Sequence, residues 1–480
     1  MRLGDLIDGL TDLAGDAAVS GFAIDNRKVA PGVVFGAFQG ARVNGEEFIP
    51  AAVRAGAIAV VARPDAVVEG AVHIADPEPR RLFAHLAARY FAPFPAVTVA
   101  VTGTNGKTST VELVRQLWRQ LGEKAASVGT LGITTAVDQV STGLTTPDVV
   151  TFLANLSGLK REGIGHVAFE ASSHGLDQYR TEGLPVRAGA FTNLSRDHLD
   201  YHGDMDRYFA AKMRLFEEVV DADGAAVVWM DDPRSGEVVG HVARRGLTLL
   251  SVGEAGETLR LVSRTPTAMG QDLVIEAEGA THRLALPLIG AYQAANALVA
   301  AGLVIATGTP VQPVLKALER VQGVRGRLER AVITREGAPV YVDYAHTPDG
   351  LRAAIEALRP HTAGRLITVF GAGGDRDAGK RPLMGRVAVE LSDVVIVTDD
   401  NPRGEDPSAI RAAVLAGVAQ VREGGVTEIG GRRDAIAAAI AQAGKGDVVL
   451  LAGKGHEQGQ IIGDRVLPFD DVTVARECAA

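Results

Sequence analysis

The sequence has very little cysteine: Cys478 is the only one among 480 residues. A single thiol forms neither an internal disulfide nor a cysteine zinc cluster, which excludes the small disulfide-stapled and zinc-ribbon classes. Basic residues are not in excess either. The formal net charge is −9, so no nucleic-acid partner is expected. No apolar run reaches about 20 residues, so we expect no transmembrane helix and no membrane partner.

Acidic residues interrupt the N-terminal segment at Asp5 and Asp8, too early for a secretory signal. The remaining composition, 46% hydrophobic and 22% charged, is that of a folded chain with ordinary cores. Its length predicts roughly two to four domains. We therefore expect a soluble cytoplasmic enzyme.

The most informative stretch is residues 97–110, VTVAVTGTNGKTST. Its β-branched apolar start predicts a strand, and a helical pattern follows the glycine-containing loop. Gly103 and Gly106 allow several backbone N–H groups to surround an anion. Lys107 adds a positive charge, and the Thr108 hydroxyl suits Mg²⁺. The general phosphate-loop motif requires another glycine where Val101 stands, so the prediction of a nucleotide-phosphate site depends on the strand, loop and helix together.

The chain divides into three predicted α/β units, residues 1–90, 91–325 and 326–480. The first contains expected strands at 21–26, 33–38 and 58–62, and it ends at a segment with two prolines, Pro93 and Pro95. The second has expected strands at 97–102, 166–170, 188–192 and 225–230. Four more are expected in the third unit, at 339–344, 366–370, 393–398 and 447–452.

Polar residues follow many of these strands, where parallel sheets bind their ligands. Glu170 ends one strand of the second unit, and its carboxylate suits Mg²⁺ better than the imidazole of His198 does. Arg376, Arg403 and Lys454 follow strands of the third unit and indicate an anionic ligand, although such residues are also common on solvated loops. From the residues alone we predict a Mg²⁺–ATP enzyme with an anionic second substrate.

A series of motifs runs through almost the whole chain: TGTNGKT, EASSHG, NLSRDHLDYHGD, AAK, Gly290–Asn296, GRLE, DYAHTPD, GGDRD, DNPR and GKGHE. In this order they resemble the Mur ligase family of peptidoglycan synthesis. The resemblance implies a UDP-binding N-terminal domain, a central ATPase-like domain with a parallel sheet, and a Rossmann-like C-terminal domain that binds an amino acid.

Within the family, the motifs are most similar to the ligases that add meso-2,6-diaminopimelate to the D-glutamate of UDP-N-acetylmuramoyl-L-alanyl-D-glutamate. The resemblance implies an acyl-phosphate intermediate, ATP as co-substrate and two Mg²⁺ ions. The metal ligands and catalytic residues so implied are Lys107, Thr108, Glu170, His198 and a carbamylated Lys212.

The implied ATP contacts are Gly103, Thr104, Asn105, Gly106, Lys107, Thr108, Ser109, Asn296, Arg327 and Asp343. Those implied for the UDP-muramoyl dipeptide are Ile24, Asn26, Ala41, Arg42, Val43, Thr145, Thr146, Ser172, Gln178 and Arg180. Those implied for diaminopimelate are Arg376, Asp400, Asn401, Pro402, Arg403, Gly453 and Glu457. Two positions depart from the family pattern: Asn26 replaces a frequent serine, and Gln293 replaces the first asparagine of G-x-x-N-x-x-N.

Other functions remain open at this point. A ligase of the same family that adds lysine differs only in the amino acid that it joins to the substrate. The motif DNPR and the stretch Asp197–Asp200 disfavour a folylpolyglutamate synthetase. A nucleotide-binding switch that hydrolyses ATP without ligation is a different class, and it would need no amino-acid pocket. Arg403 and Glu457 indicate that such a pocket exists.

Overall fold

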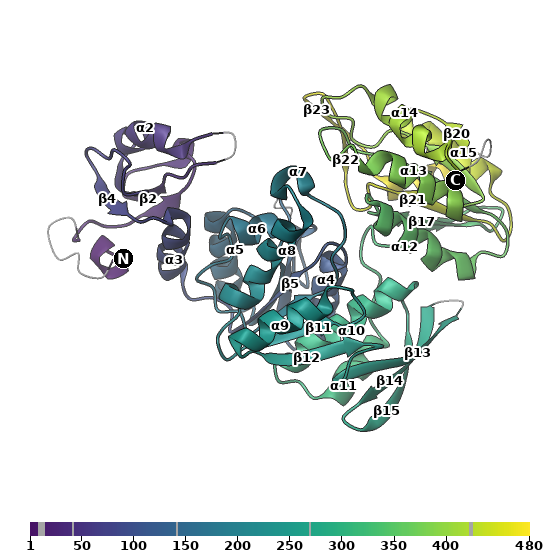
Figure 1. Ribbon diagram of the computed structural model, residues 1–480, viewed down its shortest axis with the longest axis horizontal. Helices are drawn as coiled ribbons and strands as arrows, with labels where there is room; N and C mark the ends of the chain where they lie inside the picture. Colours follow the sequence, from purple (N-terminus) through teal and green to yellow (C-terminus); the bar gives the residue numbers. More distant parts are fainter. Residues whose placement is uncertain (8–14, 41–42, 141–142, 268–269, 422–425) are drawn as a thin grey trace.

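The computed structural model describes residues 1–7, 15–40, 43–140, 143–267, 270–421 and 426–480. Three large sheets follow one another along the chain, with strands within residues 21–75, 97–286 and 329–452. The central unit joins the N-terminal unit on one side and the C-terminal unit on the other (Figure 1). The predicted α/β class is confirmed, and the boundaries near residues 90 and 325 stay a prediction. No helix in the described ranges is long and apolar enough to cross a membrane.

The N-terminal unit is a four-stranded parallel sheet in the order β1-β2-β3-β4. Its elements are α1 (Leu3–Leu6), β1 (Gly21–Ala23), η1 (Asn26–Lys28), β2 (Val33–Gly36), η2 (Gly45–Phe48), α2 (Ile49–Arg54), β3 (Ala57–Ala62), β4 (Val72–Ala75) and α3 (Pro79–Phe91). The strand expected to reach residue 26 ends at Ala23, because the Asp25 side chain accepts a hydrogen bond from the Arg27 N–H and starts the turn η1.

The central sheet has eleven strands in the order β15-β14-β13-β12-β11-β10-β5-β9-β6-β7-β8. They are β5 (Val97–Thr102), β6 (Ala125–Gly129), β7 (Gly132–Thr134), β8 (Gln139–Val140), β9 (His166–Glu170), β10 (Ala188–Phe191), β11 (Ala225–Trp229), β12 (Thr248–Gly253), β13 (Leu259–Thr267), β14 (Gly270–Ala277) and β15 (Ala280–Leu286). The strands from β6 to β13 in this order are parallel, with β5 between β9 and β10. This pairing brings the ends of β5, β9 and β10 to one edge.

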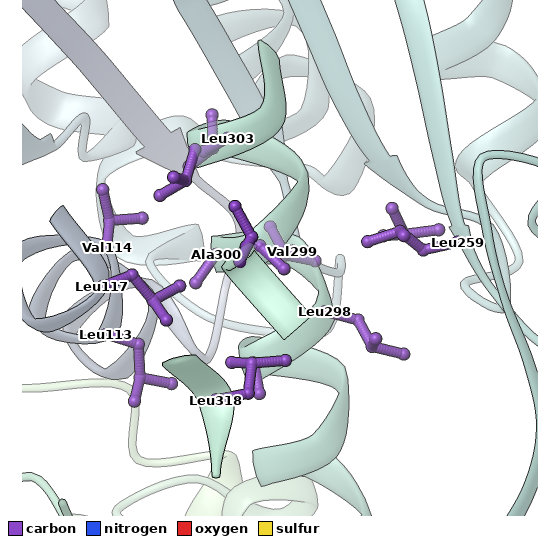
Figure 2. Close-up of a cluster of buried hydrophobic side chains, with 14 of the residues drawn as sticks. Leu113, Val114, Leu117, Leu259, Leu298, Val299, Ala300, Leu303 and Leu318 are labelled. Carbon is purple, nitrogen blue, oxygen red and sulfur yellow. The ribbon is translucent and has the colours of Figure 1, made fainter. Parts of the chain in front are cut away.

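Helices cover both faces of this sheet. They are α4 (Lys107–Gln120), α5 (Val149–Arg161), α6 (Ser173–Asp177), α7 (Leu199–His202), α8 (Met205–Arg214), the π-turn η3 (Leu215–Val219), α9 (Ser235–Arg245), α10 (Ala291–Ala306) and α11 (Val311–Leu318). One apolar cluster joins α4, α10 and α11 to the sheet, and Figure 2 shows Leu117 of α4 beside Ala300 of α10. A second cluster joins α5, α8 and α9 to the opposite face.

Strands β13, β14 and β15 form an antiparallel extension that the sequence analysis did not anticipate. Their buried and exposed residues alternate, since one side faces the core and the other faces solvent. At the other edge of the sheet, β7 pairs antiparallel with β6, and β8 pairs antiparallel with β7.

The C-terminal sheet has the order β16-β17-β21-β18-β19-β20, and only β16 is antiparallel to its neighbour. Its strands are β16 (Glu329–Ile333), β17 (Pro339–Asp343), β18 (Leu366–Phe370), β19 (Val394–Val397), β20 (Val426–Glu428) and β21 (Val448–Ala452), with a separate hairpin β22 (Gly459–Ile462) and β23 (Arg465–Pro468). Its helical elements are α12 (Pro348–Leu358), η4 (Arg359–His361), α13 (Lys380–Leu391), α14 (Pro407–Val418), α15 (Arg432–Gln442) and α16 (Asp471–Ala479). Helices α12, α13 and α14 cover one face, and α15 and α16 cover the other.

A fully buried ion pair joins α15 to α16. Arg432 Nε donates to Asp471 Oδ1 at 2.8 Å, and both side chains are 0% exposed. Arg432 Nη2 also donates to the Ala452 carbonyl at 3.0 Å, at the end of β21. The same two helices carry an exposed pair, Arg433 and Glu477, whose side chains are 56% and 50% exposed.

We predict that Asp471→Ala destabilises the protein by about 3–5 kcal/mol, because Arg432 would remain buried without its counter-charge. The matched variant Glu477→Ala should lower the free energy of unfolding far less, since Arg433 stays hydrated. Denaturant unfolding of the full chain, followed by circular dichroism, compares the two free energies of unfolding. Equal losses of unfolding free energy in the two variants would contradict the stabilising role of the buried ion pair.

Candidate active site

The glycine loop lies between β5 and α4, at the middle of the central sheet edge. Gly103 has φ 143° and Gly106 has φ 88°, values that favour glycine. A Cβ at Gly103 would lie 2.0 Å from Thr192 Oγ1, and one at Gly106 would lie 2.3 Å from Asn296 Oδ1. Both glycines are therefore required by close packing as well as by backbone conformation.

Two lysine side chains contact this loop. Lys107 Nζ donates to the Gly103 and Thr104 carbonyls at 2.9 and 2.8 Å. Lys212, which is 1% exposed in α8, donates to the same Gly103 carbonyl at 2.7 Å. Burial lowers the pKa of Lys107, although Glu170 opposes the shift. Burial, together with the charge of Lys107, holds the pKa of Lys212 well below its usual value.

Glu170 ends β9 and is 1% exposed. Its Oε1 accepts a hydrogen bond from the Thr130 N–H at 2.7 Å, and its Oε2 accepts one from the Thr130 hydroxyl at 3.1 Å. The buried Thr108 hydroxyl accepts a hydrogen bond from Arg327 Nη2 at 2.9 Å. The structure thus fixes the orientation of both predicted oxygen ligands.

His198 precedes α7 with a left-handed φ of 54°. Its Nε2 lies 3.5 Å from Asp197 Oδ2, and its ring centroid lies 4.9 Å from that of His174. Burial lowers the pKa of His198 to about 3, although Asp197 opposes the shift, and Lys107 and Lys212 are close enough to contribute. Lys107 and Lys212 thus lie near His198, and Lys107 lies near Glu170, whereas the catalytic roles of these four residues stay a prediction.

The donor set fits Mg²⁺ at Thr108 and Glu170. Within the described part of the chain, no group of three or more His, Cys, Asp or Glu side chains is placed to hold a metal ion. A hydroxyl and a carboxylate supply the hard oxygen ligands that Mg²⁺ prefers, with water completing its shell. Lys212 would fit only as a carbamate, because its ammonium form repels a cation.

The predicted ATP residues lie where the central and C-terminal units meet. Asn296 of α10 faces Gly106, and its amide lies 3.4 Å from Gln293 Oε1. Gln293 in turn donates to the Arg327 carbonyl at 3.3 Å. Asp343, at the end of β17, accepts a hydrogen bond from the Leu328 N–H at 2.7 Å. A cavity of about 570 Å³ lined partly by Gln293 and Arg327 opens beside this group.

Arg327 Cζ lies 4.6 Å from the Tyr344 ring centroid, so this side chain is held both by that ring and by Thr108. Burial raises the pKa of Asp343, and the charge of Arg327 opposes the shift. Residues after β10 orient Thr104 and Asn105. Thr104 Oγ1 accepts a hydrogen bond from the Ser195 N–H at 2.9 Å, and the Asn105 N–H donates one to Asn193 Oδ1 at 2.9 Å.

The residues predicted for the muramoyl peptide form one hydrogen-bonded network next to Glu170. Thr146 Oγ1 donates to the Glu170 carbonyl at 2.8 Å and lies 3.0 Å from Ser172 Oγ. Arg180 donates to the Thr146 carbonyl at 2.6 Å and to Gln178 Oε1 at 2.7 Å. Thr145 Oγ1 joins the network through Thr130 Oγ1, 3.1 Å away.

The residues predicted for the UDP group belong to the N-terminal unit instead. Ile24 and Val43 are 38% and 57% exposed, and Asn26 begins η1. Ala41 and Arg42 lie outside the described residues. The structure therefore distributes the predicted nucleotide-sugar contacts over two units joined by α3, which packs on α5 through a shared apolar cluster.

Three of the residues predicted for diaminopimelate, Asp400, Asn401 and Glu457, contact a buried lysine. Lys454, which is 0% exposed, donates to Asn401 Oδ1 at 3.1 Å and to Glu457 Oε2 at 3.0 Å. Its Nζ also lies 3.5 Å from Asp400 Oδ1, and Asn401 donates to Glu457 at 2.8 Å. Glu457 is thus already paired within the protein. Gly453 follows β21, where its N–H donates to the Asp343 carbonyl at 3.1 Å.

Arg403 follows Pro402 with a left-handed φ of 50°. Its Nη1 donates to the Gly374 carbonyl at 2.9 Å and lies 3.4 Å from that of Asn401. In the described ranges its Nε and Nη2 make no hydrogen bond, so they are available to a ligand. Arg376 is exposed, and its Nη1 lies 3.5 Å from the Asp375 carbonyl.

Several residues at the site were not singled out from the sequence. Tyr208 Oη lies 3.2 Å from Thr104 Oγ1, and its ring faces Lys212 at 4.3 Å. His346 Nε2 lies 4.0 Å from Asp197 Oδ2, across the two units. Asp197 and His346 belong to family motifs, which could have indicated that they lie at the site. Nothing in the sequence around Tyr208 indicated that it lies beside the glycine loop.

Three family models match the chain. Residues 101–304 match the Mur ligase middle domain, residues 326–455 match the glutamate ligase domain of Mur ligases, and residues 18–88 match the catalytic domain of the Mur ligase family.

Curated relatives match over nearly the full length. The UDP-N-acetylmuramoyl-L-alanyl-D-glutamate–2,6-diaminopimelate ligase of Zymomonas mobilis is 61% identical over 473 residues, which are 98% of this chain and 96% of the relative. The enzyme of that name from Caulobacter vibrioides is 51% identical over 479 residues, with 98% and 97% covered.

A solved structure of a UDP-N-acetylmuramoyl-L-alanyl-D-glutamate–2,6-diaminopimelate ligase superposes with a TM-score of 0.73 at 31% identity, covering 100% of this chain and 98% of the other. The MurF ligase from Thermotoga maritima, solved with ADP, shares the fold with a TM-score of 0.64 at 20% identity over 95% and 96% of the two chains. Because the motifs, the arrangement of three sheets and these full-length similarities agree, this chain belongs to the Mur ligase family.

Proposed function

We propose that this enzyme joins meso-2,6-diaminopimelate to the D-glutamate of UDP-N-acetylmuramoyl-L-alanyl-D-glutamate, with hydrolysis of ATP to ADP and phosphate. The observation that carries this proposal is the 61% identity to a ligase of that name over 98% of the chain. We place the reaction in the cytoplasm, where ATP is available, and expect a monomer.

The proposed reaction has two steps. The D-glutamate carboxylate attacks the γ-phosphate of ATP, and the bond to the β-phosphate oxygen breaks to leave ADP. The amine of diaminopimelate, after loss of a proton, then attacks the acyl phosphate and phosphate leaves. Positioning and neutralisation of charge are the main tasks of the protein in such a reaction.

The loop N–H groups and Lys107 would hold the β- and γ-phosphates, and Arg327 would hold the nucleotide together with Asn296 and Asp343. The network of Thr146 and Arg180 would orient the dipeptide so that its carboxylate faces the γ-phosphate. Thr108 and Glu170 would hold one Mg²⁺, and Glu170, His198 and the carbamate of Lys212 a second. When bound, these ions neutralise charge on the phosphates.

One experiment separates this proposal from its rivals. Purified enzyme with ATP and the UDP-muramoyl dipeptide is offered meso-diaminopimelate or L-lysine, and both product and released phosphate are measured. Product with diaminopimelate alone supports the proposal. Product with lysine alone would identify the lysine-adding enzyme, and phosphate release without either amino acid would favour a nucleotide switch.

We predict that Lys107→Ala lowers turnover by about 100- to 1,000-fold, because it removes one preorganised charge at the transferring phosphate. The exposed Lys124, just beyond α4, provides the control variant Lys124→Ala, which should keep wild-type turnover. Circular dichroism verifies that both variants fold. Near-normal phosphate release by folded Lys107→Ala would contradict the phosphate-loop assignment.

We also predict that Lys212 carries a carbamate formed with CO₂. The reaction needs a neutral amine, and burial of Lys212, together with the nearby charge of Lys107, favours that form. Enzyme equilibrated with ¹³C-labelled bicarbonate should show a carbamate NMR signal that is absent from Lys212→Ala. The exposed Lys316, paired with Glu319, provides the control Lys316→Ala, which should keep the signal. A signal that survives in Lys212→Ala would refute this assignment.

We predict, finally, that Arg403 selects diaminopimelate. This amino acid carries a distal carboxylate that lysine lacks, and the free Nε and Nη2 of Arg403 suit two parallel hydrogen bonds to it. Lysine should be used about 10⁴-fold less well, since Arg403 would then stay unpaired. Arg403→Ala should lose most of this selectivity in kcat/KM while its KM for ATP is unchanged.

The control for Arg403 is Arg465→Ala, which removes an exposed arginine in the adjacent hairpin. This variant should discriminate between the two amino acids as the wild type does. Unchanged selectivity in Arg403→Ala would locate the specificity elsewhere.

A further inference from the structure

Arg80 in α3 holds an uncompensated charge between the N-terminal and central units. Its Nη2 donates to the Gln39 carbonyl at 2.9 Å, and its Cζ lies 4.9 Å from the Phe38 ring centroid. No ion pair joins it to a carboxylate among the residues that the structure describes. The adjacent Arg81, by contrast, lies 3.5 Å from Glu218. Burial lowers the pKa of Arg80, so its charge is incompletely hydrated.

Arg180, in the central unit, also has no carboxylate partner among the described residues. Its hydrogen bonds go to the Thr146 carbonyl and to Gln178 Oε1, which are neutral acceptors, and it too has no ion pair in the described ranges. Burial lowers the pKa of Arg180, and the charge of Arg80 shifts it in the same direction. The charge of Arg80 is therefore close enough to affect Arg180.

The backbone around these arginines holds them near each other. Tyr179, which precedes Arg180, donates through its hydroxyl to Glu78 Oε1 at 3.1 Å, and Glu78 directly precedes α3. The carboxylates that act on the pair are engaged elsewhere. Asp177 accepts a hydrogen bond from Tyr201 Oη at 2.6 Å, and Asp148 caps α5. Two desolvated cations without a counter-charge are the arrangement that an anionic ligand stabilises.

The location of Arg80 indicates which part of the substrate supplies this anion. Its partner Gln39 forms a β-bridge with Asn44, which follows Val43 on the side proposed for the UDP group. Arg180 belongs to the Thr146 network, which reaches Glu170 and the proposed site of acyl transfer. Between a uridine end and a muramoyl-peptide end, the substrate carries its diphosphate.

We propose that Arg80 binds the diphosphate of the UDP-linked substrate, with Arg180 on the peptide side. The substrate's identity is taken from the proposed function. A guanidinium matches phosphate oxygens with two parallel, charge-assisted hydrogen bonds, and the aromatic face of Phe38 restricts its orientation. Neither residue would touch the reacting carboxylate, so Arg80 acts in binding and leaves the chemical step unchanged.

Steady-state kinetics test this assignment. Arg80→Ala should raise the KM for the UDP-muramoyl dipeptide by about tenfold to a hundredfold, with kcat and the KM for ATP unchanged. Arg80→Lys should recover part of the loss, and the neighbouring control Arg81→Ala should behave as wild type. With the truncated substrate N-acetylmuramoyl-L-alanyl-D-glutamate, Arg80→Ala and the wild type should have equal kcat/KM. An equal loss with this truncated substrate would mean that Arg80 holds the peptide carboxylate, and would overturn the proposal.

Equilibrium binding provides a readout that does not depend on ligation. Calorimetry should show that the wild-type chain binds UDP at least tenfold more tightly than uridine, and that Arg80→Ala removes most of this difference. If the wild type does not distinguish UDP from uridine, or if Arg80→Ala still does, the diphosphate assignment is wrong. If diaminopimelate is not ligated but the UDP preference depends on Arg80, the proposed function fails while this site stands.

Discussion

The close packing of the loop at residues 103–106 is the constraint on which the rest of the site depends. Thr192 Oγ1 and Asn296 Oδ1 occupy the space that a Cβ would need at Gly103 and Gly106. This contact fixes the loop between two parallel strands and the start of α10. The carbonyl of Gly103 then accepts hydrogen bonds from both Lys107 and Lys212, which places two amine side chains at the end of β5.

Positive charge without a local counter-ion recurs along the proposed path of the substrates. Lys107, Arg80 and Arg403 donate hydrogen bonds to backbone carbonyls, and Arg327 donates one to a threonine hydroxyl. Neutral acceptors orient these groups without cancelling their charge. The anionic substrates would supply the missing charge, so binding and local stability should be coupled.

The C-terminal unit uses the opposite arrangement for its own framework. Lys454 is buried with Asp400, Asn401 and Glu457, and Arg432 is buried with Asp471. These paired charges hold the loops after β19 and β21 in place. Arg403, which lies outside this network, is left with free donors on a loop of fixed geometry.

The sequence by itself determined the features that depend on neighbouring residues: the α/β class, the glycine loop after β5, the polar residues that follow β9, and the family motifs. Tertiary structure decided how residues far apart in the sequence meet. The antiparallel extension β13–β15, the pairing of Glu457 with Lys454, and the hydrogen bond from Tyr179 to Glu78 depend on how separate elements pack. Local sequence patterns reveal hydrophobic periodicity, turns and the positions of charged residues. Whether a charge is buried, and whether another charge compensates it, depends on partners that only folding brings together.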